Sequence, residues 1–334
     1  MKHNQMDFKS QLIQRFASKG LAESSVNLYV RALEKLNGIN NPFTSLNFLK
    51  DHKAVMEGIS HLKPNTQRSI LIAIVSALSL FKGKPGVDAL TKKYYDPMIE
   101  IRDKMRPFDE GHQKTPTQEE NWVPWEDVAQ KFSDLQQQVQ VIKAMKTKEG
   151  NPDLFNILTD AVVLGLYATM PPRRNKDFYN MLVVEQYDPS TMSQMNILDY
   201  ANRRFIFNDY KTQKTYGTQS VQIPEDLWEI IEVYIHKRGD KLAPMGVVRK
   251  KNGRVVPRSR TFKPFPFLEH FNGSHFSTNS ITRILNRIFQ RQISSSMLRH
   301  IFLSSKYGHL MEEQKTVAEG MGHSTSMQKA YIKQ

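Results

Sequence analysis

The chain has 334 residues, no cysteine, and 47 lysines and arginines against 33 aspartates and glutamates, a formal net charge of +14. Its length exceeds the size at which one hydrophobic core usually keeps growing, so we expect two domains. The hydrophobic content of 39% excludes a fully disordered chain, and the lack of cysteine excludes a disulfide framework, a thiolate zinc site and a cysteine nucleophile.

The basic excess is spread along the chain. Residues 1–108 hold 17 basic and 9 acidic side chains, and the remainder holds 30 and 24. Such a charge indicates a polyanionic partner such as nucleic acid, and the alternative is a basic, solvated surface without that role. The sequence has no apolar run long enough to cross a membrane and no secretory signal, so we expect a soluble, intracellular protein without a membrane partner.

Residues 1–107 predict a small helical domain. In "SSVNLYVRALEKL" apolar residues recur at spacings of three and four, with Ser24 or Ser25 placed to cap the helix. "NTQRSILIAIVSALSLF" is apolar nearly all round, as in the middle of a bundle, and Asn65 or Thr66 could cap it. After the glycine and proline of "FKGKPGVD", a further helix is expected to end near Pro107.

Residues 108–122 are polar and lack periodicity, which predicts an interdomain linker. In residues 123–334, helices are expected in "WVPWEDVAQKFSDLQQQVQVI" and "PDLFNILTDAVVLGLYATM", and again in "EDLWEIIEVYIHK", "NSITRILNRIFQR", "SSSMLRHIFLSSKYG" and "EEQKTVAEGMG". Between them, "RRFIFNDY" and "SVQI" predict two strands of a hairpin joined by "KTQKTYGTQ". The predicted class is mainly α with a small antiparallel β-sheet.

Several basic side chains occupy positions suited to anion binding. Arg173 and Arg174 follow two prolines that must end the preceding helix, and Asp177 could hold one of the guanidinium groups. Arg299 lies among apolar neighbours, so it either forms a buried ion pair or reaches a pocket that receives an anion. Lys211 and Lys214 lie in the predicted hairpin loop, where exposed lysines often serve only solubility.

The order of these residues resembles that of the tyrosine recombinase (phage integrase) family. An arginine in "RRNKD" is followed by the hairpin lysines of "DYKTQK", then by "SMLRH" and "MGHSTSMQKAY". The resemblance covers essentially the whole chain. It implies a helical core-binding domain over residues 1–107 that clamps DNA, and a mixed α+β catalytic domain over residues 123–334.

The resemblance assigns a role to each motif. Arg174 is similar to the first catalytic arginine, with Asp177 in place of that family's glutamate and Arg173 as the alternative register. Lys211 is the better candidate for the hairpin lysine, and Lys214 is the reserve.

The motifs near the C-terminal end supply the second arginine, a histidine and the nucleophile. "SMLRH" gives Arg299, with Ser296 where the family usually has histidine, and "MGHSTSMQKAY" gives His323 and the nucleophile Tyr331. His300 is next to Arg299 but should point about 100° away on a helix, so we do not expect it to replace the missing histidine.

The implied chemistry is cleavage and rejoining of double-stranded DNA through a 3′-phosphotyrosine, with no metal or other cofactor. A homo-tetramer on DNA is the implied assembly. We expect a DNA-associated protein of a virus or mobile element, in the host nucleus or cytoplasm. Two alternatives stay open, a type IB topoisomerase that relaxes DNA and a DNA-binding protein whose active site has decayed.

Overall fold

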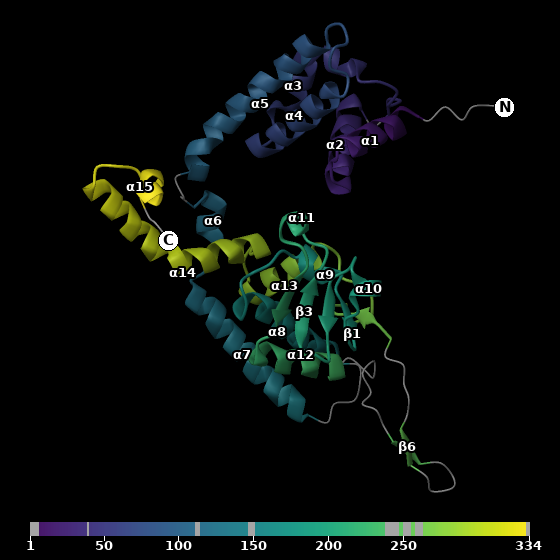
Figure 1. The fold of residues 1–334 in the computed structure, drawn as a ribbon, viewed down its shortest axis with the longest axis vertical. Coiled ribbons are helices and arrows are strands. Elements are labelled where there is room, and N and C mark those ends of the chain that lie inside the picture. Colours follow the sequence, from purple (N-terminus) through teal and green to yellow (C-terminus); the bar gives the residue numbers. More distant parts are fainter. Residues whose placement is uncertain are drawn as a thin grey trace, which may run out of the picture. The chain divides into compact units, whose positions relative to one another are not determined.

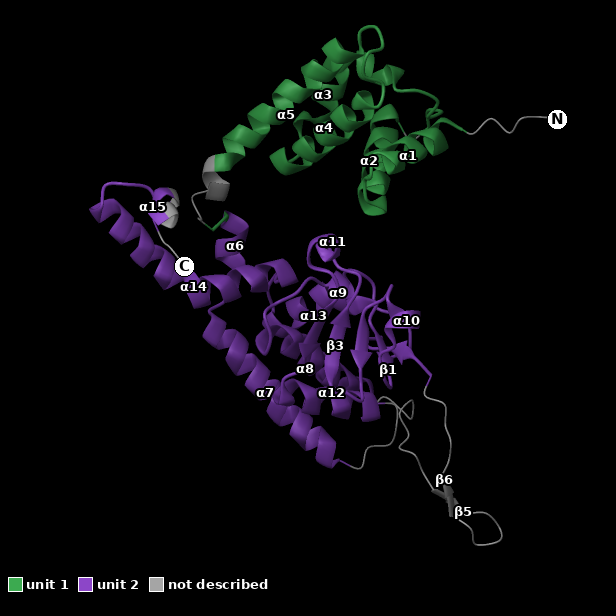
Figure 2. Ribbon diagram, in the orientation of Figure 1, with its two compact units in different colours: residues 1–115 green, residues 116–334 purple. Residues whose placement is uncertain are grey.

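The computed structural model of the chain describes residues 7–38, 40–110, 114–145, 151–237, 247–249, 255–257 and 263–331. It divides into two compact units, residues 1–115 and 116–334 (Figure 2). The described chain is mainly helical with a small five-stranded sheet, which confirms the predicted combination of a mainly α chain with a small sheet. None of the helices in these ranges is long and apolar enough to cross a membrane.

The first unit is entirely helical in its described part (Figure 1). Its elements are α1 (Phe8–Ser18), α2 (Glu23–Asn37), the 3₁₀ helix η1 (Asn47–Lys50), α3 (His52–Ser60), α4 (Pro64–Ser79) and α5 (Val87–Glu110). α4 packs against α2 and α5, and its apolar side chains form the centre of the core. Tyr94 of α5 is fully buried, and its hydroxyl donates to the Leu49 carbonyl at 2.7 Å, which holds η1 against α5.

The two helices predicted here from periodicity are present, but the predicted caps are wrong. α2 buries Val26, Val30 and Leu33 as the spacing requires, yet its N-cap is Ala22, without a side-chain cap. α4 begins earlier than predicted, with Lys63 as N-cap and Pro64 in the first turn. Proline fits there because its fixed φ suits the first turn and its missing N–H has no helical partner.

The segment predicted as an aperiodic linker is partly helical. α5 continues past Pro107 to Glu110, and α6 covers Pro116–Asn121. Residues 111–113 lie outside the described residues. Pro116 opens α6 in the same favourable first-turn position, a signal that the polar composition of the segment conceals. The division between the units falls after Thr115.

The second unit combines helices with seven strands in the part of the chain that the structure describes. After α6, its helices are α7 (Trp125–Ala144), α8 (Pro152–Ala168), α9 (Lys176–Tyr179), α10 (Pro189–Met192), α11 (Gln213–Tyr216), α12 (Glu225–Lys237), α13 (Ser280–Phe289), α14 (Ser295–Gly320) and α15 (Thr325–Tyr331). The strands are β1 (Leu182–Val184), β2 (Ile197–Asp199), β3 (Arg204–Phe207), β4 (Gln219–Gln222), β5 (Val247–Arg249), β6 (Val255–Pro257) and β7 (Phe265–Pro266).

The main sheet is mixed, so the prediction of an antiparallel sheet is wrong in part. Its order is β4-β3-β2-β1-β7, and β1 pairs with β2 in parallel while the other pairs are antiparallel. The predicted hairpin of β3 and β4 is present. The parallel pair arises because the chain returns through α10 before it enters β2, and three-residue strands carry too little periodicity to predict from sequence.

Successive side chains of β3 point to opposite faces of the sheet, and each face has its own apolar core. Phe205 and Phe207 of β3 point into the large core that α7, α8, α12 and α13 complete, whereas Ile206 points into a small cluster under α10. α8 lies at the centre of the helical layer, where it packs against α7, α12 and α13. The turn that follows α8 is therefore fixed to the most buried part of the unit.

α14 is one helix of 26 residues, although the sequence suggested two. Gly308 lies where a break was expected, and the helix continues through it. Its first turns bury Met297, Leu298 and Ile301, and its later part extends away from the body of the unit to α15 (Figure 1).

Candidate active site

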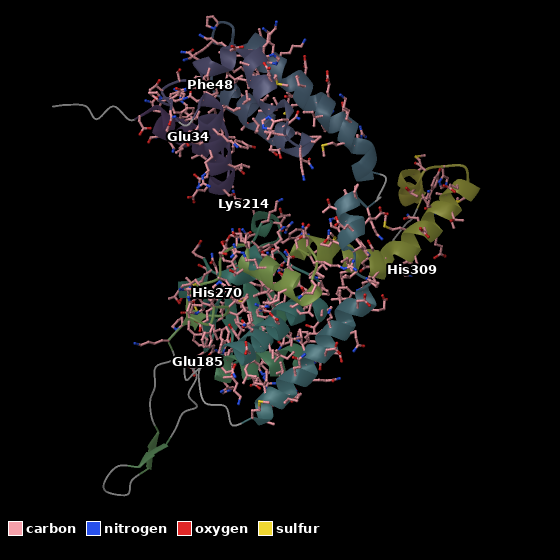
Figure 3. The ribbon with its side chains drawn as sticks, turned by 180° about the vertical axis from the view of Figure 1, so that it is seen from behind. Glu34, Phe48, Glu185, Lys214, His270 and His309 are labelled. Carbon is pink, nitrogen blue, oxygen red and sulfur yellow. The ribbon has the colours of Figure 1, made fainter. Side chains whose placement is uncertain are left out.

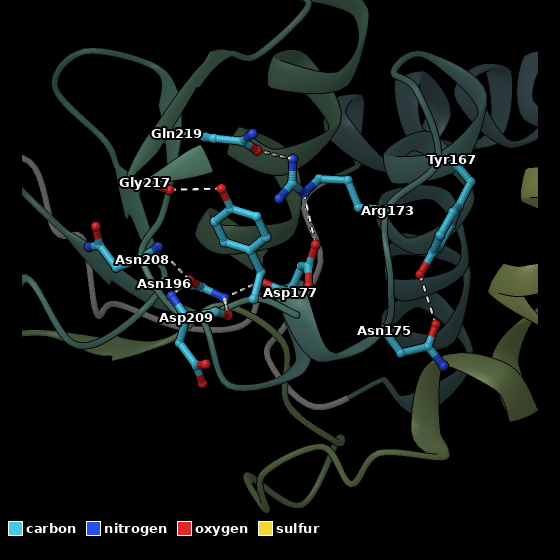
Figure 4. A network of polar contacts seen from close by, with 10 residues as sticks. Tyr167, Arg173, Asn175, Asp177, Asn196, Asn208, Asp209, Gly217 and Gln219 are labelled. Atoms are coloured by element: carbon cyan, nitrogen blue, oxygen red, sulfur yellow. Dashed lines mark hydrogen bonds and ion pairs between the residues drawn. The ribbon is translucent and has the colours of Figure 1, made fainter. Parts of the chain in front are cut away.

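Arg173 is held rigidly in the turn between α8 and α9 (Figure 4). Its Nε donates to Asp177 Oδ2 at 2.9 Å, its Nη1 donates to Gln219 Oε1 at 2.8 Å, and its guanidinium lies 3.8 Å from the centre of the Phe207 ring. The guanidinium is thus engaged by the protein at two of its nitrogens and on one face. Asp177 holds one of the two guanidinium groups, as the sequence allowed, and it is that of Arg173.

Asp177 is 2% exposed and shares this environment. Burial raises the pKa of its carboxyl, and the neighbouring Arg173 acts in the opposite direction without cancelling the rise. Oδ1 of the same carboxyl is buried without a hydrogen bond. Removal of either partner of the Arg173–Asp177 pair would therefore leave the other charge uncompensated in a largely buried place.

Arg174 differs from its neighbour in having its guanidinium available. It is half-buried, and no hydrogen bond or ion pair engages its side chain among the residues that the structure describes. Its charge lowers the pKa of Asp177, but less than the charge of Arg173 does. Its backbone is fixed, since its carbonyl accepts from the Asp177 amide at 2.9 Å. A half-buried guanidinium on a fixed backbone, without a hydrogen-bonded protein partner, is suited to an anionic ligand.

Arg299 lies in the second turn of α14 and has the same properties. Its side chain is half-buried and makes no ion pair with any described residue. Ser294 caps the helix by accepting from the Met297 amide at 3.2 Å. The buried ion pair considered for Arg299 from its apolar surroundings is therefore absent from the described structure, which leaves the anion-binding alternative.

A buried tyrosine of α8 helps to fix the turn that carries Arg174. The Tyr167 hydroxyl donates to Asn175 Oδ1 at 2.9 Å (Figure 4), and Asn175 Nδ2 donates to Thr282 Oγ1 of α13 at 2.9 Å. Burial raises the pKa of Tyr167, while hydrogen bonding with Ser295 opposes the rise. Because Asn175 follows Arg174, the turn that carries this arginine is fixed to both α8 and α13.

Asn196 fixes the base of the β3–β4 connection. Its Nδ2 donates to the carbonyls of Asp177 and Asp209, and its Oδ1 accepts from the amides of Asn208 and Asp209. Tyr210 closes the connection by donating to the Gly217 carbonyl at 2.7 Å. Neither Asn196 nor Tyr167 could be singled out from the sequence, since Asn196 lies in a polar segment and Tyr167 in an apolar helix where an aromatic residue is ordinary.

The hairpin lysines project from this fixed base. Lys211 is exposed directly after Tyr210, and Lys214 is exposed on α11 (Figure 3). The network from Asn196 to Asp177 connects the start of this connection to the turn that carries Arg174. Lys211 and Arg174 thus extend from backbone that one hydrogen-bond network connects.

Ser296 and His300 are both exposed on α14. Ser296 is the residue at the position where the resemblance implies a histidine. His300 makes no hydrogen bond, ion pair or ring contact with any described residue, and on a helix it points about 100° away from Arg299.

His323 and Tyr331 lie together at the far end of α14. Gly322 adopts a φ of 71°, and the amides of Gly322 and His323 donate to the carbonyls of Glu319 and Ala318, which is a Schellman motif. This turn reverses the chain into α15. The Tyr331 ring stacks on the His323 ring at 5.7 Å and an angle of 26°, and both imidazole nitrogens are buried without a partner.

Tyr331 is 65% exposed and does not lie at the arginines in this arrangement. α15 packs against the end of α14, well apart from α9 and α11 in the plane of Figure 1, and depth could only increase that separation. The structure places Arg174 in the turn before α9, Lys211 in the β3–β4 connection and Arg299 near the start of α14, whereas His323 and Tyr331 lie at the far end of α14.

No protein-family model, curated protein or solved structure matches the chain. Within the described ranges there is also no group of three or more histidine, aspartate and glutamate side chains that could hold a metal ion.

Proposed function

We propose that the chain is a site-specific DNA recombinase that cleaves and rejoins strands through a 3′-phosphotyrosine. The observation that supports this most is the contrast between Arg173, whose guanidinium is engaged by the protein, and Arg174 and Arg299, whose guanidinium groups are half-buried without a described hydrogen bond. Two such groups in one unit suit the two nonbridging oxygens of one phosphodiester. The net charge of +14 favours DNA as the source of that phosphate.

Each remaining residue has a role in this reaction. The Tyr331 hydroxyl attacks phosphorus and forms a phosphotyrosine bond as the bond to the 5′ oxygen breaks. Lys211 protonates the departing oxygen, and Arg174, Arg299 and His323 stabilise the charge of the crowded transition state. The phenol, whose usual pKa is about 10, loses its proton to water, because Ser296 cannot carry a proton at neutral pH. The reverse attack by a second 5′ hydroxyl rejoins DNA.

Catalysis requires α15 to change its place. Tyr331 and His323 have to reach the phosphate held by Arg174 and Arg299, either by movement of α15 in the same chain or from a second copy. The stacking of Tyr331 on a histidine with two unsatisfied nitrogens favours release, since those nitrogens gain hydrogen bonds when the rings separate.

A trapping experiment tests the proposed function. The full chain is used to select duplexes from a random-sequence library, and the bound duplexes are nicked so that cleavage releases a short strand and traps the covalent complex. Wild type should form a complex that survives denaturation. Tyr331→Phe should abolish it while changing DNA binding by no more than a few fold, and Tyr95→Phe, which alters another half-exposed tyrosine, should not affect it.

Arg174→Ala and Arg299→Ala should each slow complex formation by about 10²-fold or more, measured at saturating protein. A covalent complex that persists in Tyr331→Phe would contradict the proposal, as would normal rates in both arginine variants. Mixing Tyr331→Phe with Arg174→Ala identifies the source of the tyrosine, because only delivery from a second copy restores cleavage in the mixture. Transfer of the trapped strand to a second duplex then separates recombination from relaxation.

A further inference from the structure

The outer part of α14 carries an unusual number of exposed apolar side chains. Of the 15 large hydrophobic side chains that are exposed in the described chain, 8 lie on α14, α15 and the turn between them. Six of them fall between Leu303 and Met321, with exposures from 43% to 61%. Monomeric proteins rarely leave a continuous apolar strip of this kind in water.

Five of these six residues fall on a heptad repeat, whose sixth position is the polar Gln314, while Met311 lies beside the repeat. Leu303, Leu310 and Val317 are spaced by seven, and so are Tyr307, Gln314 and Met321, which gives alternating steps of four and three. We call these six positions the α14 seam. A repeat of 3.5 residues keeps one face of a helix in register with a second helix, so the pattern indicates a helical partner and not a flat surface.

The charge of this segment argues against DNA as the partner of the seam. Residues 303–321 carry two lysines and three glutamates, a slight acidic excess in a chain whose net charge is +14. A surface that binds phosphates requires the opposite composition. The seam therefore fits a protein partner, and a second copy supplies a helix with the same heptad repeat.

The charges beside the seam select the orientation of that second helix. Lys306 and Glu313 flank the same edge of the seam, seven residues apart. In a parallel pair these positions would face Met311 and Ala318 of the second copy, which carry no charge. In an antiparallel pair that is centred near Leu310, Lys306 of each copy faces Glu313 of the other, which makes two attractive contacts.

We propose that the α14 seam is a self-association surface on which two copies of the chain pack α14 against α14 in antiparallel orientation. Tyr307 of one copy then packs against Leu310 of the other, and Leu303 against Gln314. The half-exposed apolar groups of two copies amount to an interface near the lower bound of about 1,200 Å² for specific association, so we expect a dissociation constant in the micromolar range.

The same register has a consequence for α15. It brings Ala318 of the second copy, close to the turn that leads into α15, level with Arg299 on the first copy.

The self-association does not depend on the proposed function, because it follows from the seam and its flanking charges alone. It is measured without DNA, so that its failure and the failure of strand cleavage are separate results.

Sedimentation velocity of the full chain, without DNA and at about 0.15 M salt, tests this proposal. Wild type should shift from monomer to dimer between about 1 and 100 μM. Lys306→Glu and Glu313→Lys each convert two attractive contacts into repulsive ones and should weaken the dimer about tenfold or more. An equimolar mixture of these two variants should recover association, since both contacts of the mixed pair again join a glutamate to a lysine.

The matched control is Glu312→Lys, which makes the same charge change on the opposite side of α14 and should leave the dimer unchanged. Leu310→Glu should abolish association, whereas Leu28→Glu, at an exposed leucine of α2, should not. A wild type that stays monomeric throughout the range would overturn the proposal. A mixture of the two charge variants that stays dissociated, or equal weakening by Glu312→Lys, would overturn it as well.

Discussion

Replacement of Arg173 by alanine should destabilise the second unit far more than replacement of Arg174. The Arg173 side chain is 20% exposed and that of Asp177 is 3% exposed, with 2.9 Å between Nε and Oδ2. Removing one partner of a buried pair leaves an uncompensated charge and costs about 3–5 kcal/mol. The lost hydrogen bond to Gln219 adds to this, whereas Arg174→Ala removes only partial packing and should cost under about 1 kcal/mol.

The loss should depend on pH in a defined direction. Burial raises the pKa of Asp177 in the folded protein, and removal of Arg173 takes away the largest effect that lowers it. A carboxyl whose folded pKa lies above its unfolded value of about 3.9 stabilises the fold at low pH and loses that contribution as pH rises through the folded pKa. Arg173→Ala should therefore be destabilised less at about pH 4.5 than at about pH 7.5.

Tryptophan fluorescence during urea unfolding measures this in the full chain. All three tryptophans, Trp122, Trp125 and Trp228, belong to the second unit, so their signal reports that unit alone. The double variant Arg173→Ala/Asp177→Asn should recover part of the stability at pH 7.5 and show no such pH dependence. Equal losses in Arg173→Ala and Arg174→Ala, or a loss independent of pH, would refute the reasoning.

Three further changes have defined outcomes. Gly165→Ala should cost about 1–3 kcal/mol in the same unfolding assay, because the added Cβ would lie 2.7 Å from Leu227 Cδ1; an unchanged midpoint would show that the leucine moves aside freely. Gly322→Ala should free α15, since a φ of 71° disfavours alanine, and hydrogen exchange should accelerate in α15 while the body of the unit stays protected. Ser296→His should speed single-turnover covalent attachment by up to about 10²-fold near neutral pH, with the gain shrinking toward about pH 9.5; equal rates across that range would remove the argument for a missing base.

Long periodic elements could be predicted from the sequence. The apolar spacing of α2, α8 and α12 reflects burial on one or all sides, which the structure bears out. The short strands β1, β2 and β7 could not be predicted, because two or three residues show no periodicity. Their pairing also depends on segments that are distant in the sequence. For the same reason the sheet was expected to be antiparallel and is mixed.

The candidate site could also be predicted only in part from the sequence. Sequence order suggested Arg174, Lys211 and Arg299, but it left open which arginine Asp177 pairs with, because the choice depends on the turn after α8 and on Gln219, which lies 46 residues beyond Arg173. The place of Tyr331 could not be predicted either. It depends on the continuity of α14 through Gly308 and on the Schellman turn at Gly322, and both reflect local backbone geometry that residue spacing does not report.

The most direct test of the proposed function is to identify the residue that carries DNA in the trapped complex. The complex formed on selected, nicked duplexes is digested with nuclease and protease, and the peptide that retains a nucleotide is sequenced by mass spectrometry. The proposal predicts a 3′-linked nucleotide on Tyr331. Attachment to any other residue, or no covalent complex on duplexes that the protein binds, would contradict it.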